Sequence, residues 1–158
     1  MTTNIHELLQ SDVDGTEILA ELKALLHAHP GAAQERDRWE SLPLHVATGK
    51  QASEAVVQAL LEIDAGAARV KDCGGSLPLH LVPFYQASEE VVRALLAAYP
   101  GAAQEKDYGE SLPLHLALKN QASEEVVQVL LEAHPGAAME KDKWKFLPLH
   151  YAACHQAS

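Results

Sequence analysis

The chain has 158 residues, 47% of them apolar and 22% charged, so it is long enough to bury the core of one ordinary domain. Its formal charge of −10, from 22 acidic and 12 basic side chains, disfavours binding to the phosphate backbone of nucleic acids. No apolar stretch approaches the roughly 20 residues that a membrane-spanning helix needs, and the polar start Met1–Asn4 does not resemble a signal peptide. With only two cysteines, Cys73 and Cys154, the composition predicts a soluble intracellular protein in the cytoplasm, with a nuclear location left open.

One motif, Leu-Pro-Leu-His, recurs along the chain at a spacing of 35 residues. It occupies residues 42–45, 77–80, 112–115 and 147–150. An aspartate precedes each copy, at Asp37, Asp72, Asp107 and Asp142, and Gln-Ala-Ser follows each copy, at 51–53, 86–88, 121–123 and 156–158. Self-similarity at such a period predicts a repeat array, in which each unit packs against its neighbours.

The N-terminal segment 6–15 aligns with the start of a unit but lacks Pro-Leu-His. Its acidic residues Glu7, Asp12 and Asp14 predict a polar, solvent-facing cap. We therefore treat residues 1–158 as one array. Its predicted parts are a cap at 6–40, units at 41–75, 76–110 and 111–145, and a partial unit at 146–158 that has no C-terminal cap.

Each unit is predicted to contain two helices. The first begins near residues 42, 77, 112 and 147, because proline suits the first turn of a helix, where its missing N–H costs nothing. The second begins after a serine N-cap followed by glutamate, and it ends before a proline. The serines are Ser53, Ser88 and Ser123, and the prolines are Pro30, Pro100 and Pro135. Valine and leucine pairs four residues apart form an apolar stripe on this second helix.

The segment between the aspartate and Leu-Pro-Leu-His is short and predicts a hairpin-like finger closed by the aspartate. Gly74, Gly75 and Gly109 allow positive φ there. Because the glycines do not stand at one shared position, we expect the finger conformation to vary between units. Because every unit carries one of these aspartates, closure of the finger explains them better than a catalytic role does.

Taken together, these residues resemble the ankyrin repeat over roughly 16–158. The resemblance implies an all-α repeat solenoid, with stacked helix pairs, short β-turn fingers and a concave surface that binds proteins. The period departs from the usual 33 residues, and leucine stands where the family has threonine, so the usual hydroxyl-to-imidazole bond cannot form. The tetratricopeptide repeat has a similar period, but its tryptophan, Leu-Gly and tyrosine positions are absent.

Four histidines, one in each Leu-Pro-Leu-His motif, form a ladder: His45, His80, His115 and His150. Stacked helices lie roughly 8–10 Å apart, whereas ligands of one zinc ion sit about 2 Å from it, so two rungs cannot share an ion. We expect each imidazole to bond to backbone in or next to its finger, and we expect no metal site and no cofactor.

Enzymatic chemistry has little support in the sequence. Cys154 lies near His150 and His155, but no third member and no oxyanion site accompany them. Neither a phosphate-binding glycine loop nor a His-Glu-x-x-His motif occurs. We predict a non-catalytic protein with no catalytic residues.

Six of the eight aromatic residues cluster in the fingers and at the end of one first helix, while the predicted core positions are occupied by leucine, valine and alanine. The ankyrin resemblance places these positions on the concave surface. Together with neighbouring cations, the predicted partner-binding residues are Arg38, Trp39, Phe84, Tyr85, Tyr108, Lys143, Trp144 and Phe146. Alternatively, some of these rings only shield the finger bases, and Phe146 is the foremost candidate for that role.

We therefore predict a scaffold that binds another protein or peptide. One alternative is a structural spacer, or an array that self-associates through an uncapped C-terminal end, where Leu147, Leu149 and Tyr151 are expected to lack partners. Another is the targeting segment of a larger enzyme.

Overall fold

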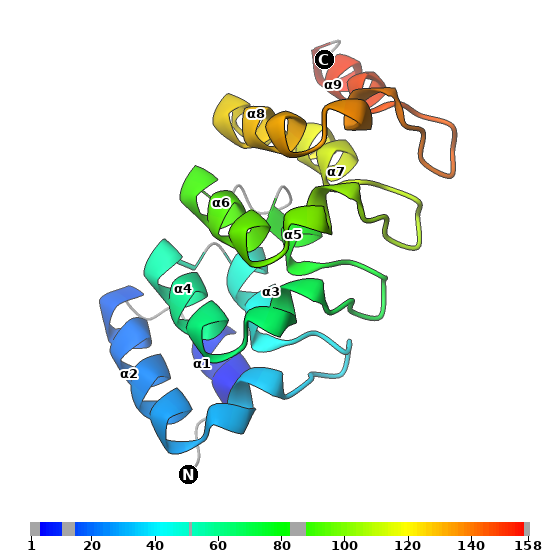
Figure 1. Cartoon of the computed structure of the whole chain (residues 1–158). Coiled ribbons are helices and arrows are strands. Elements are labelled where there is room, and N and C mark those ends of the chain that lie inside the picture. The colour runs from blue at the N-terminus through cyan, green and yellow to red at the C-terminus, as the bar shows by residue number, and fades with distance from the viewer. Residues whose placement is uncertain (1–3, 11–14, 51, 83–87, 157–158) are drawn as a thin grey trace.

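The computed structural model of the chain describes residues 4–10, 15–50, 52–82 and 88–156. Across these residues the protein is helical, and no β-strand occurs among them. The helices lie in two adjacent rows that run the length of the molecule, and four loops project from the side of the first row that faces away from the second (Figure 1).

The two rows alternate along the chain. The first row consists of α1 (Ile5–Gln10), α3 (Pro43–Gly49), α5 (Pro78–Leu81), α7 (Pro113–Lys119) and α9 (Pro148–Gln156). The second row consists of α2 (Gly15–Ala28), α4 (Glu54–Ile63), α6 (Glu89–Ala98) and α8 (Glu124–Ala133). Each helix contacts the next one in its own row, and α3, α5 and α7 also contact the second-row helix that follows them in sequence.

The helix starts follow the local sequence. In α3, α5, α7 and α9 proline occupies the opening turn, and the preceding leucine, such as Leu42, has an extended backbone with φ −78° and ψ 161°. In the second row Ser88 and Ser123 stand at the N-cap, and their hydroxyl oxygens accept from the backbone N–H three residues later at 3.4 Å. Ser53 occupies the same position without a side-chain bond.

The second-row helices end where the prolines predict. Helices α2, α6 and α8 stop two residues before Pro30, Pro100 and Pro135. A short 3₁₀ helix, which was not predicted from the sequence, then follows each second-row helix. These are η1 (Pro30–Gln34), η2 (Ala65–Arg69), η4 (Pro100–Gln104) and η5 (Pro135–Met139).

The core lies between the rows and between successive helices of each row. The second leucine of the motif is buried in three units, and the valine and leucine stripe of α4 and α6 is largely buried against neighbouring helices. Glu7 on α1 is exposed, whereas Ile5, Leu8 and Leu9 are buried there. Their burial follows from the contact between α1 and α3, which gives α1 an apolar face. Asp12 and Asp14 lie outside the described residues.

Candidate protein-binding surface

The four projecting loops, residues 35–41, 70–76, 105–111 and 140–146, are here called the loop edge. Each loop closes in the same way. In the first, the Asp37 N–H donates to the Ser41 carbonyl at 3.0 Å, and Asp37 Oδ1 accepts from the N–H groups of Trp39 and Ser41 at 2.8 and 2.9 Å. The same bonds recur at Asp72, Asp107 and Asp142. The expected variation between loops is therefore wrong, because the aspartate bonds alone fix a common closure.

One position in every loop has a left-handed backbone, whichever residue occupies it. The residues are Glu40, Gly75, Glu110 and Lys145, with φ of 60°, 75°, 56° and 68°. Of the three loop glycines that allow positive φ, Gly75 adopts it, whereas Gly74 and Gly109 do not. Three loops thus hold a residue with a side chain in a conformation that favours glycine, which the closing bonds must stabilise.

Neighbouring loops are joined at their tips by backbone hydrogen bonds. The Cys73 N–H donates to the Trp39 carbonyl at 3.0 Å, the Tyr108 N–H to the Gly74 carbonyl at 3.0 Å, and the Lys143 N–H to the Gly109 carbonyl at 3.1 Å. These bonds tie each loop to the one before it, so the loop edge forms one connected surface.

Ion pairs connect the bases of the last three loops. The Lys71 ammonium lies 3.0 Å from Glu105 and donates to the Lys106 carbonyl at 2.9 Å, and the Lys106 ammonium lies 2.9 Å from Glu140. The pKa of the Glu105 carboxyl is lowered mainly by the hydrogen bond from Lys71, and further by the hydrogen bond from the Tyr99 hydroxyl. These pairs have no local signal in the sequence, because their partners are separated by about one whole repeat.

The histidine ladder bonds to backbone on both ring nitrogens, as expected, in three of its four rungs. His45 Nδ1 accepts from the Leu42 N–H at 3.1 Å, so the proton belongs on Nε2, which donates to the Ser76 carbonyl at 3.1 Å. His115 makes the equivalent bonds, with Nε2 donating to the Phe146 carbonyl at 3.2 Å. His80 Nδ1 likewise accepts from the Leu77 N–H, but its Nε2 donates to the Glu105 carbonyl at the start of the following loop, at 3.1 Å. The leucine that precedes Pro-Leu-His thus supplies its backbone N–H to the imidazole.

Three of the ladder histidines, His45, His80 and His115, are buried as neutral rings. Burial lowers the pKa of His45 and His115, and it lowers the pKa of His80 to about 4, despite the opposing effect of nearby aspartates and carbonyls. His150 is exposed, and among the described residues its ring accepts one hydrogen bond, from the Leu147 N–H to Nδ1. The ladder therefore joins units through uncharged hydrogen bonds.

His6, which sequence reasoning missed, extends the ladder into the first unit. It is buried, and its Nε2 lies 3.1 Å from the Ser41 carbonyl, the position that corresponds to Ser76 in the next loop. His6 stands outside any Leu-Pro-Leu-His motif, so the repeat pattern gave no signal for it.

Three predicted aromatic residues lie exposed on the loop edge. Tyr108 is 73% exposed, and Trp39 and Trp144 are each about half exposed. Both tryptophans carry a stacked cation: the Arg38 guanidinium lies 3.9 Å from the Trp39 ring centroid, and the Lys143 ammonium lies 4.4 Å from that of Trp144. The two ends of the loop edge thus present the same chemical unit, a tryptophan under a cation.

Phe146 differs from these three residues, because other rings surround it. Its ring centroid lies 5.8 Å from those of His150 and Tyr151, although its side chain is about half exposed. This arrangement agrees with a shielding role. Phe84 and Tyr85 lie outside the described residues.

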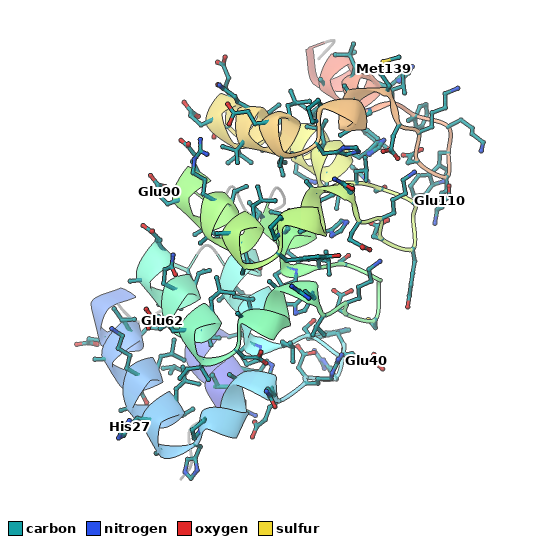
Figure 2. The ribbon with its side chains drawn as sticks, in the orientation of Figure 1. His27, Glu40, Glu62, Glu90, Glu110 and Met139 are labelled. Atoms are coloured by element: carbon teal, nitrogen blue, oxygen red, sulfur yellow. The ribbon has the colours of Figure 1, made fainter. Side chains whose placement is uncertain are left out.

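A hollow of about 320 Å³ opens between the first loop and the first-row helices. It is lined by Gln10, Trp39, Ser41, Val46, Lys50 and Leu81, among others. Glu40 and Glu110 also lie on the loop edge, whereas Glu62 and Glu90 lie on the second row (Figure 2). The charge of the loop edge is therefore mixed, with cations over the tryptophans and carboxylates nearby.

Tyr151 has partners, contrary to expectation. Its hydroxyl donates to Asp142 Oδ2, and its ring meets His115 edge-on. Burial opposes ionisation of Asp142, but the bonds from Tyr151 and from the N–H groups of Phe146 and Trp144 outweigh it and lower the pKa of the carboxyl. Burial and this carboxylate raise the pKa of Tyr151 to about 12. The last loop is thereby fixed to α9.

Two further observations concern the described part of the chain. No three His, Cys, Asp or Glu side chains gather there in an arrangement that could hold a metal ion. None of its helices combines the length and the apolar character needed to cross a membrane. Neither a scan against known protein families nor a search among curated proteins finds a match for this chain.

Proposed function

We propose that the chain is an ankyrin-like repeat solenoid that acts as a non-catalytic scaffold and binds another protein or peptide. The four loops of the loop edge would be the fingers of this solenoid. The binding surface would consist of the loop edge and the adjoining face of the first-row helices. The observation that carries the proposal is the exposure of Trp39, Tyr108 and Trp144 on loops that are held by hydrogen bonds. Large exposed aromatic residues on a pre-organised surface are typical of binding hot spots.

The chemistry of the surface suggests the kind of segment that would bind. The hollow beside Trp39 has apolar walls from Val46 and Leu81 and suits an aliphatic anchor. Arg38 and Lys50 at one end, and Lys143 at the other, favour acidic residues in the partner. A peptide or an exposed protein segment with aliphatic anchors and flanking acidic residues would fit both features.

Selection of displayed random peptides on the immobilised chain tests this proposal. Enriched peptides should carry aliphatic and acidic residues. Their affinity should fall by roughly 1–4 kcal/mol in each of the variants W39A, Y108A and W144A, because truncation removes buried ring area from the contact. Unfolding stability should change by no more than about 1 kcal/mol, since these rings are largely exposed.

Glutamates on the second row provide the matched control. The variants E54Q, E89Q and E124Q alter charge at the first turns of α4, α6 and α8, away from the loop edge, and should leave peptide affinity unchanged. If affinity survives all three aromatic truncations and falls with the glutamate variants, the binding site lies on the second row and the proposal is wrong.

A further inference from the structure

Helices α8 and α9, at the end of the two rows, carry apolar side chains whose counterparts in earlier units are buried. Leu149 is 71% exposed, whereas Leu44, Leu79 and Leu114 at the same repeat position are 0–2% exposed. Val127 on α8 is also less buried than its counterparts in α4 and α6. This surface, with Val127, Leu131 and Leu149 at its centre, is here called the terminal face.

Among the described residues, two polar groups of the terminal face lack the partners that their counterparts have in earlier units. His80 Nε2 and His115 Nε2 donate to a carbonyl of the following loop, whereas no described carbonyl meets His150 Nε2. Lys71 and Lys106 pair with a glutamate of the following loop, and within the described residues Lys141 has no such partner. Within the described residues, the terminal face thus presents the same kinds of groups that are paired at the internal junctions.

The two halves of the terminal face carry opposite charge. On α8, Glu124 and Glu132 flank the apolar side chains and line a hollow of about 490 Å³ together with Val127, Gln128 and Leu131. The loop that leads into α9 carries exposed lysines at 141, 143 and 145. A two-fold axis between α8 and α9 would bring the acidic half of one copy against the basic half of another.

We propose that the terminal face is the interface of a two-fold symmetric dimer of this chain. Helix α8 of each copy would cover Leu149 of the other, and the acidic residues of α8 would meet the lysines of the partner loop. The apolar centre supplies the driving force, and the opposite charges fix the orientation. The interface shares the loop 140–146 with the loop edge, but its apolar centre lies on α8 and α9, outside the loop edge, so the proposal does not rest on the proposed function.

Sedimentation equilibrium from micromolar to millimolar concentration tests the dimer. The average mass of the whole chain should rise from that of one copy to that of two. Leu149→Glu should weaken dimerisation at least tenfold, because it places a charge in the apolar centre. Trp39→Glu, a matched change on the loop edge, should leave dimerisation unchanged, and circular dichroism should show that both variants remain helical.

Charge reversal provides a sharper test of the symmetry. The variant K141E/K145E makes both halves of the terminal face acidic, and E124K/E132K makes both halves basic. Each variant alone should be monomeric at concentrations where the wild type is dimeric, and an equimolar mixture of the two should form a heterodimer. A wild type that stays monomeric at millimolar concentration, a dimer that survives Leu149→Glu, or a mixture that stays monomeric would each overturn the proposal.

Discussion

The ring of Tyr108 occupies the space in which a side chain at Gly75 would stand. A Cβ atom added to Gly75 would lie 2.5 Å from Cδ1 and 2.8 Å from Cε1 of Tyr108. The tyrosine belongs to the third loop and the glycine to the second, so the contact connects two neighbouring loops. Gly75 is therefore required both by its φ of +75° and by the position of this ring.

Gly75→Ala should destabilise the protein by about 1–3 kcal/mol, because it adds a left-handed alanine and displaces the tyrosine ring. Urea unfolding monitored by circular dichroism would measure the change. The double variant G75A/Y108A should recover the part of the loss that comes from the ring. The loss of unfolding free energy caused by G75A is compared in the wild type and in the Y108A background. If the two losses are equal, the contact with the ring contributes nothing to the destabilisation.

Glu110→Gly should have the opposite sign and stabilise the chain by up to about 1 kcal/mol. Glu110 has a φ of +56°, which costs free energy for any residue with a side chain. Glu35→Gly is the matched control, since Glu35 has a φ of −66° and should gain nothing. A lower melting temperature for the Glu110 variant would show that the loop is not strained there.

Unfolding free energy should fall as pH decreases from about 6.5 to about 4. The folded chain holds His80 with a pKa of about 4, whereas the unfolded chain protonates it near 6.5, so the unfolded state binds more protons in this window. For His80 alone the difference corresponds to roughly 3 kcal/mol, and His45 and His115 act in the same direction. Urea unfolding at several pH values would measure the slope.

His80→Ala should cost about 1–3 kcal/mol at pH 7, because the Leu77 N–H and the Glu105 carbonyl lose their buried partner. It should also reduce the dependence of stability on pH. His27→Ala is the control, since His27 is exposed at the end of α2 (Figure 2) and its removal leaves the ladder intact. An unchanged pH slope in the His80 variant would contradict the neutral-ladder interpretation.

Leu95→Ala should destabilise the chain by about 2–5 kcal/mol, through lost burial and a residual cavity. Leu95 is fully buried in α6, in the middle of the second row. Leu149→Ala, measured at concentrations low enough to keep the chain monomeric, should change stability by less than about 0.5 kcal/mol because Leu149 is exposed. Equal losses for the two variants would contradict the packing described here.

Tyr151→Phe should cost about 1–2 kcal/mol, because the buried Asp142 carboxylate loses the hydroxyl that donates to it. Thermal unfolding would report the loss. Tyr108→Phe is the matched control, since the Tyr108 side chain is largely exposed and its hydroxyl should contribute little. An equal loss in both variants would mean that the bond to Asp142 adds no stability.

Much of the helical organisation follows from sequence alone, because local chemistry sets it. Proline opens four of the five described first-row helices, serine stands before three second-row helices, and proline follows the end of three of them. Each signal acts within one turn of its own position. The aspartate closure of the loops is equally local, since its bonds reach only two and four residues along the chain. The sequence also placed Trp39, Tyr108 and Trp144 in the loops, where the structure has them.

The contacts between units were decided by the tertiary structure. Gly75 and Tyr108, Lys71 and Glu105, and His6 and Ser41 meet only when one unit stacks on the next, and no spacing within a unit specifies these pairs. The left-handed backbone of Glu40 likewise has no local signal, because glutamate ordinarily avoids positive φ and only the closure of the loop imposes it. Sequence determined which elements form, since propensities and caps act over a few residues; stacking determined which side chains meet, since that depends on distances between units.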